Sequence, residues 1–251
     1  CEDTRVTGKL LSAFGLRTRL ERCDENVIAS RVPAVLERLE AGERVAFVSD
    51  AGMPGVSDPG QKLVDAALDA GLKVEVVPGP SAVTCALVAS GLASEHFFFE
   101  GFLPRKKSAQ VARLEELSCI PGALVVYESP RRVAATLANV AEVFPARRVA
   151  LVRELTKLHE ECARGLSGEL AEAIAARDEV RGECVVVIAA PDDEELDERR
   201  RAAAGGPATL EEAIAEGISA GEPKSGLARR LAREFGVPKS EVYDAILGAE
   251  A

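Results

Sequence analysis

The sequence predicts two α/β domains followed by a small helical module. Residues 1–93 contain two short apolar runs, each followed by a turn rich in glycine and proline and then by a helical pattern. Residues 94–190 continue this alternation of strand-like and helical segments. Such alternation is typical of a sheet that is covered by helices. Residues 207–251 have helical patterns only, so we expect them to form a separate module.

The loop SDAGMPGVSDPG at residues 49–60 is the most informative segment of the first domain. The apolar run at 44–48 predicts a buried strand. The three glycines and two prolines that follow require sharp bends of the backbone. Asp58 is expected to cap the next helix and Pro59 to begin it. Loops between a strand and a helix are common ligand-binding positions in α/β proteins.

A second unit of the same kind follows directly. Residues 74–77 predict a strand, 78–80 a turn, and Ser81 the N-cap of a helix at 82–90. Neither loop carries the Walker pattern or the Gly-x-Gly-x-x-Gly fingerprint of dinucleotide-binding proteins. The loops therefore suit a compact, weakly charged ligand rather than a di- or triphosphate, with Asp50 as the one carboxylate. Ordinary tight turns are the alternative interpretation of both loops.

The second domain is expected to contain four strands with helices between them. The strands are predicted at residues 97–101, 122–128, 148–153 and 183–189, and the helices at 110–117, 133–143 and 168–177. The segment at 191–206 begins with PDDEELDE and has the composition of an acidic linker. It separates the second domain from the helical module.

The helical module is predicted to contain three helices. Thr209 is the expected cap of a helix at 210–217, and residues 224–235 have the apolar spacing of an amphipathic helix. Ser240 is expected to cap a last helix at 241–247. The last two helices resemble a helix-turn-helix, which favours contact with nucleic acid. A helical dimerisation or packing element is the alternative.

Composition and charge limit the possible functions. The chain has 251 residues, a formal net charge of −10 and no apolar run near the roughly 20 residues that span a bilayer. We therefore expect a cytoplasmic protein without membrane contact. The six cysteines include no Cys-x-x-Cys pair, and the two histidines have no neighbours at metal-ligand spacing, so no metal is predicted. Contact with RNA would fall to local basic patches at 103–113 and 223–240, unless these are simply solvated faces.

Six motifs occur in order along the chain. They are SDAGMPGVSDPG (49–60), VVPGPSA (76–82), FFFEGFLPR (97–105), VYESPRR (126–132), RELTKLHEE (153–161) and the Gly-Glu pair before VVVI (182–188). Together they resemble the ribosomal RNA small subunit methyltransferase I family. That family belongs to the tetrapyrrole-methylase superfamily and uses S-adenosylmethionine. The resemblance covers residues 1–190 and the C-terminal module.

The resemblance implies an enzyme that methylates the 2′-hydroxyl of a cytidine in the decoding centre of 16S ribosomal RNA. Its partner would be small-subunit ribosomal RNA or the 30S subunit, and it would form a homodimer. Two alternatives stay open. One is a precorrin-type tetrapyrrole methyltransferase of the same superfold, and the other is a truncated RNA-binding relative without enzymatic activity.

The resemblance also implies that the methyl donor lies in the cleft between the two α/β domains. Carried over residue by residue, it gives these donor contacts: Ala51, Gly52, Met53, Val56, Ser81, Ala82, Glu128 and Gly182. Asp50 would be an orienting carboxylate. Such a site is physically reasonable, because carbonyl oxygens and a nearby carboxylate stabilise a sulfonium cation, and adenine needs a shaped apolar slot.

Methyl transfer to a ribose hydroxyl needs close alignment and a base that takes the hydroxyl proton. The RELTKLHEE motif supplies Glu154 and Lys157 as the catalytic candidates, with either Glu154 or a lysine of lowered pKa as the base. Arginine side chains suit contacts with phosphate groups. The candidates for RNA contact are Arg5, Arg131, Arg132 and Arg153. Salt bridges at the domain cleft are the alternative use of these charges.

The chain departs from the family pattern in two places. It begins with CEDTR, whereas in the family a strand and a loop of the TPIGNLGDI type precede this motif. We therefore expect an incomplete first domain, either as a fragment or through loss of part of the donor site. The family's histidine-rich stretch is replaced here by Cys23-Asp24-Glu25-Asn26. Residues 2–5 match the family and are expected to line the cleft.

Overall fold

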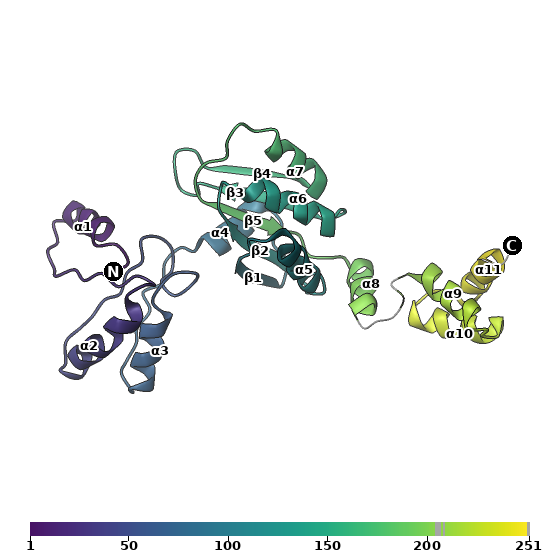
Figure 1. Cartoon of the computed structure of the whole chain (residues 1–251), viewed down its shortest axis with the longest axis horizontal. Helices are drawn as coiled ribbons and strands as arrows, with labels where there is room; N and C mark the ends of the chain where they lie inside the picture. Colours follow the sequence, from purple (N-terminus) through teal and green to yellow (C-terminus); the bar gives the residue numbers. More distant parts are fainter. Residues whose placement is uncertain (204–206, 208, 250–251) are drawn as a thin grey trace. The chain divides into compact units, whose positions relative to one another are not determined.

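The computed structural model of the chain describes residues 1–203, 207 and 209–249 (Figure 1). The chain forms two compact units, Cys1–Ala89 and Ser90–Ala251. We call these the N-terminal unit and the C-terminal unit. Among the described residues, no helix has both the length and the apolar composition that crossing a bilayer requires.

The N-terminal unit consists of helices that are joined by long loops. The helices are α1 (Thr4–Ala13), α2 (Ile28–Glu40), α3 (Gln61–Asp69) and α4 (Ala82–Ser90). Helix α4 has the predicted bounds. Helix α2 packs against α3, and Cys23, Ile28 and Leu63 form a buried cluster that Phe47 partly covers. The hydrophobic core of this unit is therefore small.

The prediction of strands at residues 44–48 and 74–77 is wrong for the described chain, because neither segment is part of a sheet. A strand needs a neighbour that exchanges backbone hydrogen bonds along its length. In the first segment, the described residues supply a single such bond, from the N–H of Glu2 to the carbonyl of Val48 at 3.1 Å. Val76 and Val77 are 72% and 86% exposed, so the second segment lies at the surface.

Helix α3 begins later than predicted. Its N-cap is Gly60 and its first residue is Gln61, so Asp58 and Pro59 belong to the preceding loop. Gly60 has a φ of +134°, and a Cβ at this position would lie 2.9 Å from the ring of Phe47. Only glycine adopts this conformation readily. The sharp bend at Gly60 therefore separates the loop from the helix.

The C-terminal unit contains a five-stranded mixed sheet in the order β1-β2-β5-β3-β4. The strands are β1 (Phe97–Phe102), β2 (Ala123–Glu128), β3 (Arg148–Arg153), β4 (Glu161–Leu166) and β5 (Cys184–Ile188). Strands β1 and β2 are parallel, whereas β5 runs antiparallel to both β2 and β3. Strands β2 and β3 therefore point in the same direction on either side of β5.

Three helices cover the sheet: α5 (Lys107–Leu117), α6 (Val133–Val143) and α7 (Ser167–Ala175). Helix α6 contacts both α5 and α7. All three were predicted, and α6 has the predicted bounds. The core includes these fully buried side chains of the strands and helices: Leu114, Leu124, Leu137, Val140, Phe144, Val149, Val186 and Ile188. This apolar interface fixes the sheet edge at which β1, β2 and β3 end.

Strand β4 was not predicted from the sequence. Its residues, ECARGL, alternate between partly buried and exposed positions and include two charged side chains. Strand β4 pairs only with β3 and forms an edge of the sheet. An edge strand needs fewer apolar residues than a central one, so its signal in the sequence is weak.

The segment predicted as an acidic linker is largely helical. Helix α8 (Asp193–Ala203) occupies most of it, and residues 204–206 lie outside the described residues. Acidic residues in its first turn and arginines in its last turn match the helix dipole. The buried guanidinium of Arg147 donates to the carboxylate of Glu195 at 2.9 Å, which ties α8 to the sheet.

The helical module contains α9 (Leu210–Ser219), α10 (Lys224–Glu234) and α11 (Lys239–Ala249). They share a core of their own, formed by Ala213, Ile214, Leu227, Ala228, Leu231, Val242 and Ile246. Thr209 caps α9 as predicted, because its side chain accepts a hydrogen bond from the N–H of Glu212. Ser240 was expected to cap the last helix, but α11 already begins at Lys239. The carbonyl of Pro238 accepts from the N–H of Val242 at 3.2 Å and so starts the first turn.

Close packing of α9 on α10 gives a test of the module core. A Cβ at Gly217 would lie 2.3 Å from Cδ1 of Leu227, which is fully buried. Gly217→Ala should therefore overpack the core and lower the local free energy of unfolding by about 1–3 kcal/mol. Hydrogen exchange at the amides of α10 measures this change. Gly226→Ala is the control, since a Cβ there meets nothing within 4 Å. Equal losses in both variants would contradict the packing argument.

Candidate active site

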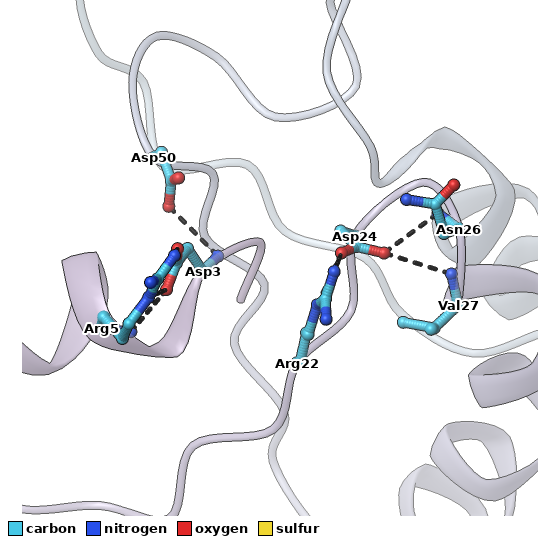
Figure 2. A network of polar contacts seen from close by, with 7 residues as sticks. All are labelled: Asp3, Arg5, Arg22, Asp24, Asn26, Val27 and Asp50. Atoms are coloured by element: carbon cyan, nitrogen blue, oxygen red, sulfur yellow. Dashed lines mark hydrogen bonds and ion pairs between the residues drawn. The ribbon is translucent and has the colours of Figure 1, made fainter.

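In the N-terminal unit, the start of the chain is bonded to the glycine-rich loop (Figure 2). The N–H of Asp3 donates to Oδ1 of Asp50 at 3.2 Å, and the N–H of Asp50 donates to Oε2 of Glu2 at 3.2 Å. Together with the bond from Glu2 to Val48, these contacts hold the beginning of the loop in place. The predicted orienting carboxylate, Asp50, is therefore positioned by two residues far away in the sequence.

Asp3 also caps helix α1. Its carboxylate accepts a hydrogen bond from the N–H of Arg5 at 2.7 Å and pairs with the Arg5 guanidinium at 2.6 Å. These bonds hold the pKa of Asp3 well below its usual range. The side chain of Arg5 is 86% exposed, so it combines an internal partner with access to solvent. Its role as an RNA contact stays a prediction.

Asp24 orders a turn before α2 (Figure 2). Its Oδ1 accepts hydrogen bonds from the N–H groups of Asn26 and Val27 at 3.0 and 3.2 Å. The Arg22 side chain donates to Oδ2 at 2.6 Å and is the largest cause of the lowered pKa of Asp24. In this chain the segment thus has a structural role.

The loop after Asp50 is largely exposed to solvent. Ala51, Gly52 and Val56 are exposed, and Met53 is half-buried. Gly52 has a φ of +75°, which bends the loop in a way that glycine permits without strain. Ser81 and Ala82 are half-buried where α4 begins. All the donor contacts predicted for the N-terminal unit therefore lie on loops or at a helix start.

In the C-terminal unit, the predicted residues gather at one edge of the sheet. Because β1, β2 and β3 point in the same direction, their carboxyl ends meet at this edge, where β5 begins. The following predicted residues lie at these strand ends or in the adjoining turns: Glu128, Arg131, Arg132, Arg153, Glu154, Lys157 and Gly182. The topology thus brings together residues from three separate motifs.

Glu128 is buried at this edge, and its carboxylate is bonded to other groups of the protein. Its side chain is 1% exposed and pairs with the guanidinium of Arg132 at 3.1 Å. Its oxygens accept further hydrogen bonds from Thr136 Oγ1 and from the N–H of Ser129, both at 2.7 Å. Arg132 also donates to the carbonyl of Leu103 at 3.1 Å. The carboxylate therefore ties the end of β2 to the loop that follows β1.

Two amide side chains extend this network into helices α5 and α6. Gln110 Nε2 donates to the carbonyl of Pro104 at 3.2 Å and to Thr136 Oγ1 at 3.3 Å. Asn139 Nδ2 in turn donates to Gln110 Oε1 at 2.5 Å. Sequence reasoning missed Gln110, Thr136 and Asn139. For Thr136 and Asn139, the available signal was two uncharged polar residues, three positions apart, on the mostly apolar helix α6.

The loop after β3 is shaped by an ion pair and by unusual backbone angles. Glu154 and Thr156 have φ values of +54° and +65°, which residues with side chains rarely adopt. Lys157 Nζ lies 2.9 Å from Glu154 Oε1 and 3.2 Å from Glu183 Oε2. The N–H of Glu183 also donates to Glu154 Oε1 at 3.2 Å. A Cβ at Gly182 would lie 2.1 Å from that same oxygen, so this position requires glycine.

These contacts shift the pKa values of the two predicted catalytic residues, Glu154 and Lys157, in opposite directions. The hydrogen bond from Lys157 is the largest cause of the lowered pKa of Glu154, and it also raises the pKa of Lys157. A lysine with a raised pKa stays protonated at neutral pH and cannot take a proton. For Lys157, the direction of the shift is opposite to the lowered pKa that a lysine base would need. The pKa of Glu154 is shifted towards the ionised form, and the choice of base stays a prediction.

The arginines of this edge that were predicted to contact RNA differ in whether their side chains are bonded within the protein. Arg153 donates to Oε2 of Glu161 at 2.6 Å and is held in place. Arg177 and Arg153 together lower the pKa of Glu161 to about 2. Arg132 is engaged by Glu128, as described above. Arg131 is exposed, and no ion pair involves it in the described part of the chain. Arg131 is therefore the arginine best placed to meet a phosphate group.

Neither a metal centre nor a disulfide bond is formed by the residues that the structure describes. Across the described ranges, no group of three or more His, Cys, Asp or Glu side chains is arranged to hold a metal ion. None of the six cysteines, all within the described ranges, forms a disulfide bond. Cys184 is buried, and burial raises its pKa to about 11. Cys85 is partly buried.

Comparison with known proteins decides the family. The family model of the Tetrapyrrole (Corrin/Porphyrin) Methylases matches residues 4–171. Ribosomal RNA small subunit methyltransferase I of Mycobacterium tuberculosis (strain ATCC 25618 / H37Rv) is 45% identical over 249 residues, which are 98% of this chain and 84% of that protein. The chain belongs to the ribosomal RNA small subunit methyltransferase I family. The Mesorhizobium japonicum member of this family is 40% identical over 98% of this chain and 81% of its own length.

Structural comparison agrees on the fold. The crystal structure of the methyltransferase CobJ superposes with a TM-score of 0.54 and 20% identity, covering 75% of this chain and 87% of that protein. The chain therefore has the tetrapyrrole-methylase fold. Its membership of the family makes it a methyltransferase. The sequence prediction of family, fold class and enzyme class is confirmed.

The buried network at Glu128 predicts a clear effect on stability. Glu128→Gln removes the charge that Arg132 and Thr136 are arranged to meet. We expect the free energy of unfolding to fall by about 1.5–3 kcal/mol, the range for a hydrogen bond to a charged group. Denaturant unfolding of the C-terminal unit measures this. Arg131→Gln, in the same turn but exposed, should leave the value unchanged. A stable Glu128→Gln variant would show that the network does not depend on this carboxylate.

Proposed function

We propose that this enzyme uses S-adenosylmethionine to methylate the 2′-hydroxyl of a cytidine in the decoding centre of 16S ribosomal RNA. The observation that carries the proposal is the 45% identity to a ribosomal RNA small subunit methyltransferase I over 98% of the chain. The sheet edge of the C-terminal unit supports it, because the turns after its strands carry an ionised carboxylate, Glu154, and an exposed arginine, Arg131. The substrate is then small-subunit ribosomal RNA or the 30S subunit.

The residues of the N-terminal loop fit the donor. When bound, S-adenosylmethionine supplies an electrophilic methyl group on a sulfonium centre. Ala51, Gly52 and Val56 are exposed residues of a loop whose carbonyl oxygens suit a cation, and Asp50 offers a negative charge that favours a nearby cation. Met53, Ser81, Ala82 and the backbone at Gly182 are the further proposed contacts. Glu128 acts on the donor side only indirectly, since its carboxylate is bonded within the protein.

Glu154 is the proposed general base. Its carboxylate is ionised, and the N–H of Glu183 and the ammonium of Lys157 fix one of its oxygens. An oriented carboxylate can take the proton of a ribose hydroxyl as the oxygen attacks the methyl carbon. Lys157 positions Glu154 and keeps it charged. Arg131 contacts a phosphate group of the RNA, while Arg132 and Arg153 hold the surrounding turns.

The proposed function also implies where the enzyme is located in the cell and which oligomer it forms. Ribosomal subunits occupy the cytoplasm, so an enzyme that modifies them works there. We further propose a homodimer, as the family resemblance implies. Sedimentation of the purified chain at micromolar concentration distinguishes a dimer from a monomer.

Donor binding is the first test. Calorimetric titration with S-adenosylmethionine should give micromolar binding, and ATP should give none. Gly52→Ala should weaken the donor at least tenfold, because it adds a side chain to the loop at a φ of +75°. Gly42→Ala is the matched control, since Gly42 has a φ of +86° and open space around it. Wild-type chain that fails to bind the donor, or equal effects of both substitutions, would contradict the assigned loop.

The base assignment is tested by rate and pH. Glu154→Gln should lower the rate of methyl transfer by a factor on the order of 10²–10⁴. Because its pKa is lowered, Glu154 stays ionised, so the wild-type rate should be constant from about pH 6 to pH 9. Glu183→Gln, which removes the other carboxylate from Lys157, is the control and should keep most of the rate. A rate that rises steadily towards the lysine range of about pH 10 would point to Lys157 instead.

A further inference from the structure

Helix α10 presents a basic face to solvent. Its opposite face buries Leu227, Ala228 and Leu231 in the core of the helical module. The exposed side lines an open groove of about 600 Å³, formed by Gly226, Arg229, Arg230, Arg233 and Glu234. Because the apolar face of α10 is buried within the module, its basic face is available to a partner.

The arginines of this groove fall into two classes. Arg230 is used internally, because its guanidinium lies 2.7 Å from Glu222 and 3.1 Å from Glu234. Arg229 and Arg233 are both exposed, and neither forms an ion pair with any residue that the structure describes. Two guanidinium groups without internal carboxylates are free to bind an external anion.

The two free arginines are aligned with further donors. Residues four apart on a helix share a face, so Ser225, Arg229 and Arg233 form one row, with about 6 Å of axial rise between neighbours. Lys239 at the start of α11 extends this row, since its Nζ lies 3.4 Å from Ser225 Oγ. We call these four residues the α10 stripe. Gly226 adds no side chain beside it, and a Cβ there would have nothing within 4 Å.

Helix α11 is the second helix of the predicted helix-turn-helix, and its charges are poorly suited to approach phosphate groups. After Lys239, the exposed charged residues of α11 are Glu241 and Asp244, both acidic. In helix-turn-helix proteins the second helix usually enters the groove of the nucleic acid. Here that position would bring carboxylates close to phosphates, which is unfavourable. The charges therefore favour contact through α10.

We propose that the α10 stripe, rather than the part of α11 that follows Lys239, binds the phosphate backbone of small-subunit ribosomal RNA. This inference rests on the proposed function for its choice of RNA as the partner. Guanidinium groups match phosphate oxygens in geometry, and a row of them follows a strand without reading its sequence. The stripe thus anchors the enzyme to its substrate, while the choice of nucleotide is made elsewhere.

Salt-dependent binding of the full chain tests the proposal. Arg229→Gln/Arg233→Gln should weaken binding to protein-free small-subunit ribosomal RNA at least tenfold in low salt. Each lost phosphate contact should reduce the slope of log affinity against log salt by about 0.7–0.9, so the double variant should lose about 1.4–1.8. Arg229→Lys/Arg233→Lys, which keeps both charges, should retain most of the slope.

The controls separate this role from folding and from catalysis. Arg17→Gln/Arg200→Gln removes two exposed arginines outside the stripe and should leave the slope nearly unchanged. Circular dichroism and donor titration should be the same for all variants. Wild-type chain that binds RNA through the stripe but neither binds the donor nor methylates RNA would defeat the proposed function alone.

Three results would overturn the proposed role of the stripe. The first is an unchanged salt slope in Arg229→Gln/Arg233→Gln. The second is a wild-type chain that does not bind RNA. The third is a loss of binding that appears with intact 30S subunits but not with protein-free RNA. In that case the stripe meets an acidic surface of a ribosomal protein.

Discussion

The buried carboxylate of Glu128 is the interaction on which the C-terminal unit's candidate site depends. A charge in an apolar core is tolerated only if hydrogen bonds and an opposite charge surround it. Arg132, Thr136 and the Ser129 N–H meet that need. The same Arg132 binds the carbonyl of Leu103, so satisfying the carboxylate also fixes the loop after β1. Two turns that could move independently are thereby held as one rigid edge.

The arginines of the chain divide into those that build the structure and those left for a partner. Arg132, Arg147 and Arg153 meet carboxylates at least partly inside the protein. Arg131, Arg229 and Arg233 stay exposed and have no such partner within the described ranges. The net charge of −10 makes the molecule as a whole repel nucleic acid. Contact with RNA therefore depends on a few exposed arginine side chains.

Much of the C-terminal unit could be predicted because its periodicity is strong. Helix α6 and strand β3 have the expected bounds, and the motifs led to the right family. The segments at 44–48 and 74–77 failed because an apolar run indicates burial, whereas a strand also needs a hydrogen-bonded neighbour. Glu128 was selected as a donor contact, and that role stays a prediction. The structure shows its carboxylate bonded to Arg132, Thr136 and the Ser129 N–H, and these partners follow from the fold rather than from the motif.

The alternating pattern of strand β4 has a consequence for solubility. Both outer strands of a sheet carry unpaired backbone groups that invite another chain to add on. Strand β4 places Glu161 and Arg164 along its length, and such charges resist desolvation by an incoming strand. Strand β1 is interrupted by a bulge between Phe99 and Gly101, which spoils the regular spacing that a templated addition requires. Each side of the sheet therefore has its own protection against amyloid-like growth.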